Sequence, residues 1–317
     1  MVEKSRIIAA DASGVAEGVA RLVAGGIVAV PTETVYGLAA RAADADAVAR
    51  IYAAKGRPSF NPLIVHVSGV AQARELVTVD ALAERLMALF WPGPLTLVLP
   101  LLPGANVAGL VTAGLETLAV RCPAHPVMQA LIAGAGPLAA PSANASGRIS
   151  ATTAAHVAAS LGDRVGLLLD GGACVAGVES TIIAVAAGHW QLLRPGAVAV
   201  EALRAVAPAL TADAAPTATA AVRAPGMLAS HYAPRQPVRL EATSAAPHEF
   251  HIGFGAIPGD ASLSAAGDLT QAAARLFDLL HIAEASGRAA IAVAPVPATG
   301  LGLAINDRLR RAAAPRD

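Results

Sequence analysis

Short apolar runs that end at a proline, a glycine or a polar loop recur along the first two thirds of the chain. They are Ile27–Val30, Leu63–Val67, Leu95–Leu99, Thr117–Arg121, Leu138–Ala140 and Leu167–Asp170. Ser180–Val185 and Trp190–Leu193 are expected to form a further pair of strands. Runs of this length without polar alternation are typical of strands buried on both faces. Segments of helical spacing alternate with them, among them Asp44–Ala54, Ala81–Phe90 and Pro126–Ala133. Strands that alternate with helices favour an α/β fold.

The composition changes after residue 206. The chain has 317 residues, which suits one large domain or two of ordinary size. Residues 207–224 are rich in Ala, Thr and Pro and poor in large apolar side chains, which indicates a linker. From Val238 the pattern predicts a small α/β unit. We therefore expect a first domain at 1–206, a linker at 207–237 and a second domain at 238–317.

Charge, cysteine count and the absence of common motifs argue against several broad classes of protein. The formal net charge is zero, which disfavours an extended face for nucleic acid or membrane but leaves room for a local basic pocket. Cys122 and Cys174 are too few for a disulfide framework, so we expect reduced thiols in the cytoplasm. The first residues lead into no apolar segment of the signal-peptide type. No Walker loop, dinucleotide-binding glycine motif or zinc-type Cys/His spacing is present.

The stretch Lys55–Val67 carries the clearest functional signal. Lys4 and Lys55 are the two lysines of a chain with 21 arginines, and Arg57 follows Lys55 two residues later. Lys presents a compact point charge and Arg a planar fork, so the pair on a proline-stiffened turn indicates a site for a polyanion. A solvent-exposed loop with two charges is the alternative.

Polar side chains follow three other predicted strands. Thr32 and Thr34 come directly after a strand, where α/β proteins bind ligands, although a capped turn would look the same. Arg121 closes an apolar strand and needs a carboxylate or a bound anion as partner. The segment 141–147 offers hydroxyl and amide groups without charge. His66 lies within a strand, where histidine is more often structural than catalytic.

These features together resemble the threonylcarbamoyl-AMP synthase family. The segments that carry the resemblance are Pro31–Gly37, Lys55–Val67, Pro141–Gly147, Gly177–Thr181, Arg194–Gly196 and Pro225–Pro234. The ending, with Asn306-Asp307-Arg308-Leu309, fits the longer form of the family, a YrdC-type domain with a C-terminal extension. The resemblance implies an α/β (α+β) fold, with a twisted open mixed sheet in the catalytic domain and a small Rossmann-like extension. The linker would act as a lid over the active site.

The resemblance also implies a reaction and its partners. The enzyme would be a nucleotidyltransferase that joins L-threonine, bicarbonate or CO2, and ATP into threonylcarbamoyl-AMP and pyrophosphate. A separate transferase complex would then pass the threonylcarbamoyl group to an adenosine of tRNA. Mg²⁺ would be carried by the ATP phosphates, tRNA binding by the chain itself would be weak, and no membrane would take part.

Carried over position by position, the resemblance assigns a role to fifteen residues. Lys55 and Arg57 are the expected catalytic residues. ATP would be bound by Lys55, Arg57, Asn61, Thr117, Asn144, Ser150, Thr152, Arg194 and Tyr232. L-Threonine would be bound by Thr32, Thr34, His66, Arg121, Ser142 and Ser180. No metal ligand is assigned.

Two other functions remain as alternatives. The first is a module that binds double-stranded RNA or tRNA without catalysis, which the zero net charge and the uncharged polar loops disfavour. Salt-sensitive tRNA binding without pyrophosphate release would support it. The second is a carbamoyl-transfer maturation factor, but the acylphosphatase and zinc-finger segments of that class are absent.

Overall fold

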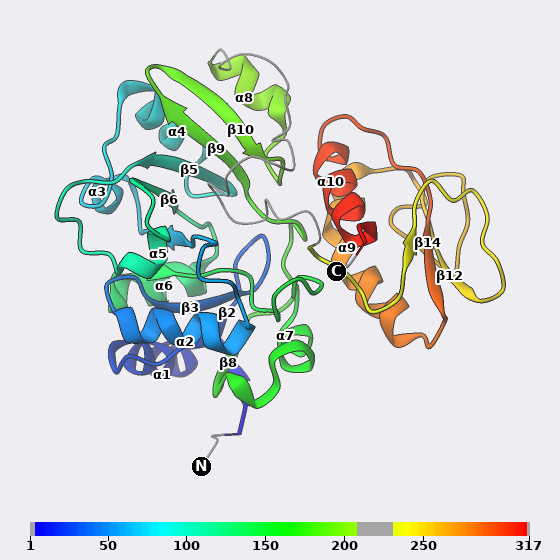
Figure 1. Cartoon of the computed structure of the whole chain (residues 1–317), viewed down its shortest axis with the longest axis horizontal. Coiled ribbons are helices and arrows are strands. Elements are labelled where there is room, and N and C mark those ends of the chain that lie inside the picture. Colours follow the sequence, from blue (N-terminus) through cyan, green and yellow to red (C-terminus); the bar gives the residue numbers. More distant parts are fainter. Residues whose placement is uncertain (1–3, 208–230, 316–317) are drawn as a thin grey trace.

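The computed structural model describes residues 4–207 and 231–315, and these form two lobes that lie side by side (Figure 1). The larger lobe holds a ten-stranded sheet and the smaller one a four-stranded sheet. Most of the predicted linker falls at residues 208–230, outside the described residues. The fold class expected from the sequence, α/β with a large mixed sheet and a second small sheet, is confirmed.

The large sheet has the strand order β1-β8-β2-β3-β7-β4-β6-β5-β9-β10. It is mixed, because β1·β8, β2·β8, β4·β6 and β5·β9 are parallel and the other five pairs are antiparallel. Its strands are β1 Arg6–Ala9, β2 Val28–Val30, β3 Gly37–Arg41, β4 Ile64–His66, β5 Leu95–Pro100, β6 Thr117–Arg121, β7 Leu138–Ala139, β8 Leu167–Asp170, β9 Thr181–Ala186 and β10 His189–Arg194.

The helices of the large lobe begin at the caps that the sequence indicates. Asp11, Asp44, Asp80 and Thr153 each accept a hydrogen bond from a first-turn backbone N–H, which satisfies an otherwise unpaired donor. The helices are α1 Ala12–Val23, α2 Ala45–Lys55, α3 Val70–Ala73, α4 Ala81–Phe90, α5 Gly109–Thr112, α6 Pro126–Ala135, α7 Ala154–Leu161 and α8 Val200–Val206, with a 3-10 turn at Gly162–Arg164.

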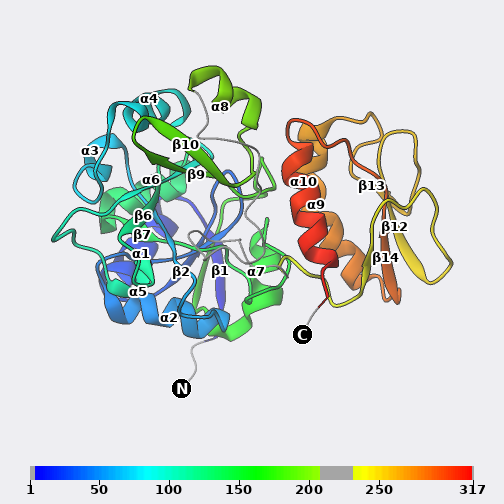
Figure 2. The same cartoon turned by 45° about the horizontal axis from the view of Figure 1, so that its top comes forward.

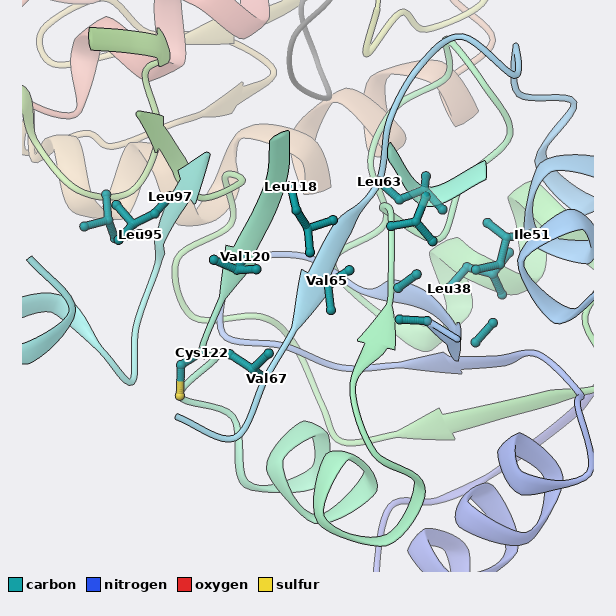
Figure 3. Packing of buried hydrophobic residues seen from close by; sticks show 14 of the residues in the cluster. Leu38, Ile51, Leu63, Val65, Val67, Leu95, Leu97, Leu118, Val120 and Cys122 are labelled. Atoms are coloured by element: carbon teal, nitrogen blue, oxygen red, sulfur yellow. The ribbon is translucent and has the colours of Figure 1, made fainter. Parts of the chain in front are cut away.

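Successive side chains of β4 and β6 point alternately into the main core and to the opposite face of the sheet. Leu63, Val65 and Val67 point into the large hydrophobic cluster, together with Leu118 and Val120 (Figure 3). Since side chains alternate between the faces of a strand, the intervening residues of β4 and β6 point the other way. The register pairs β4 residue 66 with β6 residue 121, so these two polar side chains are neighbours on that opposite face.

The small lobe is a parallel sheet with two helices. Its strands, in the order β11-β14-β12-β13, are β11 Val238–Arg239, β14 Ala290–Val293, β12 Glu249–Gly253 and β13 Ala261–Ser262. Its helices are α9 Leu269–Ala285, capped by Asp268, and α10 Gly302–Ala313. In both views α9 and α10 stand between the small sheet and the large lobe (Figures 1 and 2). The helices therefore form the face that this lobe turns toward the large one.

Two strands of the large sheet were not predicted. β3 has the sequence Gly-Leu-Ala-Ala-Arg, whose small residues have low strand propensity. It forms because β2 and β7 pair with it on either side. β1 lies at the sheet edge and is mostly exposed, so the apolar pattern is weak there. Within the two described ranges, no helix is both long and apolar enough to cross a membrane.

Candidate active site

A buried pocket lies on the face of the large sheet opposite the main core. Loop residues 34–35 and 140–142, strands β4 and β6, and the adjoining ends of β9 and β10 form it together with residues 231–232. Its free volume is about 50 Å³. Its lining consists of Thr34, Val35, Arg57, Ile64, His66, Arg121, Ala140, Pro141, Ser142, Glu179, Ser180, Arg194, His231 and Tyr232.

Arg121, the last residue of β6, is fixed by three groups. Its Nε donates to the carbonyl of Gly93 at 3.2 Å, and its Nη1 donates to Oγ1 of Thr34 at 2.9 Å. Its Nη2 lies 2.7 Å from the carboxylate of Glu33. Burial raises the pKa of Glu33, but Arg121 more than offsets burial and the net pKa lies below the usual value. A guanidinium has five N–H donors, so Arg121 keeps donors for a ligand carboxylate.

His66 is the neighbour of Arg121 on β4 and is neutral at pH 7. Burial, together with the positive charge of Arg121, lowers its pKa to about 3. Its Nδ1 is buried and has no hydrogen-bond partner among the described residues. A buried polar atom without a partner is costly, so a ligand group placed here would gain a hydrogen bond.

Lys55 and Arg57 bring buried positive charge without a carboxylate partner. Lys55 ends α2, and its Nζ donates to the backbone carbonyls of Ser142 and Asn144. Arg57 donates through Nε to the carbonyl of Asn61 at 3.2 Å and through Nη2 to that of Pro62 at 2.9 Å. In residues 4–207 and 231–315, neither cation forms an ion pair. Burial lowers the pKa of Lys55 well below its usual value, and nearby Arg57 adds to the effect.

A third cationic residue, Arg194, lines the pocket beside β9. Arg194 ends β10 and donates through Nη2 to the carbonyl of Ser180 at 2.9 Å and to its Oγ at 3.2 Å. The Ser180 hydroxyl also lies 2.7 Å from Oγ1 of Thr96, a buried residue of β5. The hydroxyl is thus held at a defined position in the wall.

His231 and Tyr232 complete the wall. Both side chains are buried, and their rings meet edge to face with centroids 4.1 Å apart. Tyr232 has φ 63°, a left-handed conformation that few residues other than glycine adopt. Ligand pockets usually measure roughly 300–1,000 Å³, so a free volume of about 50 Å³ is too small for a nucleotide. Binding of one requires part of this wall to move.

The structure brings eight of the fifteen predicted residues to the lining and places the other seven around it. The eight are Thr34, Arg57, His66, Arg121, Ser142, Ser180, Arg194 and Tyr232; the seven are Thr32, Lys55, Asn61, Thr117, Asn144, Ser150 and Thr152.

Five of these seven bond directly to lining residues, namely Thr32, Lys55, Asn61, Asn144 and Ser150. Thr32 Oγ1 lies 2.9 Å from that of Thr34, and Ser150 donates to Glu179 at 2.6 Å. Thr117 shares the sheet face of Arg121 but begins β6, at the opposite end of the strand from that residue. The ligand roles of all fifteen stay predictions.

Three charged or ionisable residues at the site were not among the predicted ones. Glu33 holds Arg121, Glu179 lines the pocket, and His231 lies beside Tyr232. Each has a signal in the sequence. Glu33 stands between Thr32 and Thr34, Glu179 directly precedes Ser180, and His231 is adjacent to a predicted ligand. The sequence does not show which of these neighbours points into the site.

The fold and this pocket define a two-domain α/β protein with a buried pocket lined by arginine, histidine and hydroxyl side chains. Residues 20–196 match the family described as telomere recombination, the Sua5, YciO and YrdC proteins. Residues 198–314 match the C-terminal domain of threonylcarbamoyl-AMP synthase.

Similar proteins span nearly the whole chain. The threonylcarbamoyl-AMP synthase of Bacillus subtilis is 41% identical over 95% of this chain and 93% of its own length. That of Pyrococcus abyssi is 40% identical over 91% of this chain and 90% of its own length. The crystal structure of P. abyssi Sua5 complexed with L-threonine superimposes with a TM-score of 0.85, at 37% identity and 94% coverage of each chain. The chain belongs to the threonylcarbamoyl-AMP synthase family, a family of transferases.

Proposed function

We propose that this chain joins L-threonine, bicarbonate or CO2, and ATP into threonylcarbamoyl-AMP and pyrophosphate, and is therefore a nucleotidyltransferase. One observation carries the proposal: two buried cations without a carboxylate partner, Lys55 and Arg57, stand close to a second cationic subsite at Arg121. The first subsite suits a polyphosphate and the second an amino-acid carboxylate. The P. abyssi relative that resembles this chain was crystallised with L-threonine.

The amino-acid subsite is organised around Arg121. Glu33, Thr34 and the Gly93 carbonyl fix the guanidinium, so its remaining N–H groups are preorganised for a carboxylate. Neutral His66 offers a hydrogen bond to the amine or the hydroxyl of threonine. The hydroxyl of Ser180, which also lines the pocket, offers a further hydrogen bond.

The proposed reaction requires the protein to position its substrates, and it needs no nucleophile from the protein. The neutral amine of threonine takes up CO2 and loses a proton, which gives a carbamate. A carbamate oxygen then attacks the α-phosphorus of ATP, the bond to the β-phosphate oxygen breaks, and pyrophosphate leaves. Lys55, Arg57 and Arg194 would hold the phosphates and offset the negative charge that develops on them. Closure of residues 231–232 would exclude water from the labile carbamate and the mixed anhydride.

Metal ions belong to the substrate in this proposal. The described part of the chain holds no group of three or more His, Cys, Asp or Glu that could bind a metal. Glu33 and Glu179, the acids at the pocket, are already paired with arginines. We propose that Mg²⁺ is carried by the ATP phosphates. We also propose a cytoplasmic location, and a separate transferase complex that uses the product to modify tRNA.

The decisive test is pyrophosphate release with ATP, bicarbonate and each amino acid in turn. Release that depends on both bicarbonate and threonine, with a product of the mass of threonylcarbamoyl-AMP, is expected. Salt-sensitive tRNA binding without any threonine-dependent release would instead favour an RNA-binding module.

A further inference from the structure

Arg308, on α10 of the small lobe, reaches into the large lobe and is fully buried. Its Nε donates to Oε2 of Glu179 at 2.8 Å, and its Nη1 donates to the carbonyl of Pro195 at 2.8 Å and to Asp307 Oδ2 at 2.7 Å. Glu179 lines the pocket, and Pro195 directly follows Arg194. A side chain of the small lobe thus supports the wall of the candidate active site.

Arg308 determines the ionisation of Glu179 and balances its negative charge next to the proposed nucleotide subsite. Glu179 is buried, and its Oε1 accepts a hydrogen bond from Ser150, a predicted ATP ligand, at 2.6 Å. Burial alone would raise the pKa of Glu179, but Arg308 and then Arg194 more than offset it and the pKa lies below the usual value. The carboxylate is therefore ionised, and Arg308 neutralises a negative charge that would otherwise repel phosphate.

Arg308 also contacts Tyr232, a second residue of the pocket wall. Its Cζ lies 5.2 Å from the centroid of the Tyr232 ring, within the distance of a cation–π contact. Its Nη2 is buried and has no hydrogen-bond partner among the described residues. One guanidinium therefore links Glu179, the backbone beside Arg194 and the side chain of Tyr232.

We propose that Arg308 is a positioning residue of the nucleotide subsite, through which the small lobe keeps the carboxylate of Glu179 paired. The inference rests on the proposed function, because it takes the phosphate subsite as given. Arg121 and His66 make no described contact with Arg308. Loss of Arg308 should weaken ATP binding and leave threonine binding nearly unchanged.

A simpler role for Arg308 would be to hold the two lobes together. The chain offers a control for it, because Arg148 of the large lobe pairs with Glu284 on α9 of the small lobe, in a more exposed setting. That pair also joins the lobes, but neither side chain lines the pocket. Arg308→Gln and Arg148→Gln each remove one ion pair between the lobes, and the first alone removes one that reaches the site.

The experiment measures, with the full chain, how tightly the protein binds an ATP analogue and how well it uses ATP and threonine. Calorimetry gives the Kd of a non-hydrolysable ATP analogue, and pyrophosphate release gives kcat and the two KM values. Arg308→Gln should raise the Kd of the analogue about tenfold or more, the range for a lost hydrogen bond to a charged group, with the threonine KM changed by about twofold at most. Arg308→Lys should recover part of the loss, and Arg148→Gln should match the wild type. Equal constants for the two Gln variants would overturn the proposal.

A pH series separates positioning from support of the fold. Removal of Arg308 should raise the pKa of Glu179 above its value in the wild type, because burial favours the neutral acid and Arg308 is the group that most offsets burial. Glu179 of the variant should then become ionised as the pH rises and increasingly repel the triphosphate. The affinity of Arg308→Gln for the analogue should fall with rising pH more steeply than that of the wild type. Adding Glu179→Gln should remove the extra slope.

The double variant leaves no unpaired carboxylate at position 179, so it replaces Arg308→Gln in these measurements if that single variant does not fold. Unchanged slopes would refute the inference. A wild type that releases no pyrophosphate with threonine would instead refute the proposed function.

Discussion

The buried histidine of the amino-acid subsite makes a specific prediction about acid stability. His66 is buried among β4, β6 and β7, and its pKa of about 3 lies well below the ordinary 6.5. Between these values the unfolded chain binds a proton at this position and the folded chain does not. Stability is therefore lost as the pH falls through this window. His66→Gln removes the titrating group and should make the protein less sensitive to acid.

The size of the effect follows from the two pKa values. At pH 5 an imidazole of pKa 6.5 is almost fully protonated, whereas one of pKa about 3 is almost fully neutral. The difference in proton binding lowers the free energy of unfolding by about 2 kcal/mol relative to pH 7.5. This figure depends little on the lower pKa, since any value below about 4 leaves the folded imidazole neutral at pH 5.

Urea unfolding of the wild type and the variant at pH 7.5 and pH 5 measures the effect. The drop in the free energy of unfolding between the two pH values should be smaller in His66→Gln by about 2 kcal/mol. Other histidines contribute equally to both proteins and cancel. His189→Gln, an exposed position on β10, is the control and should behave as the wild type. An equal drop in His66→Gln and the wild type would show that His66 is protonated in the fold or is not buried.

Four further substitutions test the phosphate subsite, the amino-acid subsite and the core. Lys55→Ala and Arg57→Ala should each abolish pyrophosphate release while circular dichroism stays that of the wild type; near-normal turnover in both would remove the phosphate subsite. Arg121→Lys should raise the KM of threonine about tenfold or more, because Lys cannot replace a bidentate charge-assisted contact, and an unchanged KM would place the carboxylate elsewhere. Leu38→Ala, at a fully buried core position, should lower the free energy of unfolding by about 2–5 kcal/mol in urea titrations without changing the KM values.

The amino-acid sequence determines the local structure of this chain closely. α4 spans Ala81–Phe90 and β6 spans Thr117–Arg121, both as predicted. The reason is that capping by Asp80, the proline at 92 and a continuous apolar run act over a few residues. The resemblance to the threonylcarbamoyl-AMP synthase family was also available from short segments, and the matches across the whole chain confirm it.

Tertiary structure alone decided which charges are paired and which remain for a ligand. Glu33 neutralises Arg121, and Glu179 meets Arg308 across a separation of 129 residues. β3 likewise exists because its neighbours β2 and β7 supply hydrogen bonds that its small residues do not favour on their own. Burial, ion pairing and cross-strand pairing depend on what lies nearby in space, and the order of residues along a chain does not contain that information locally.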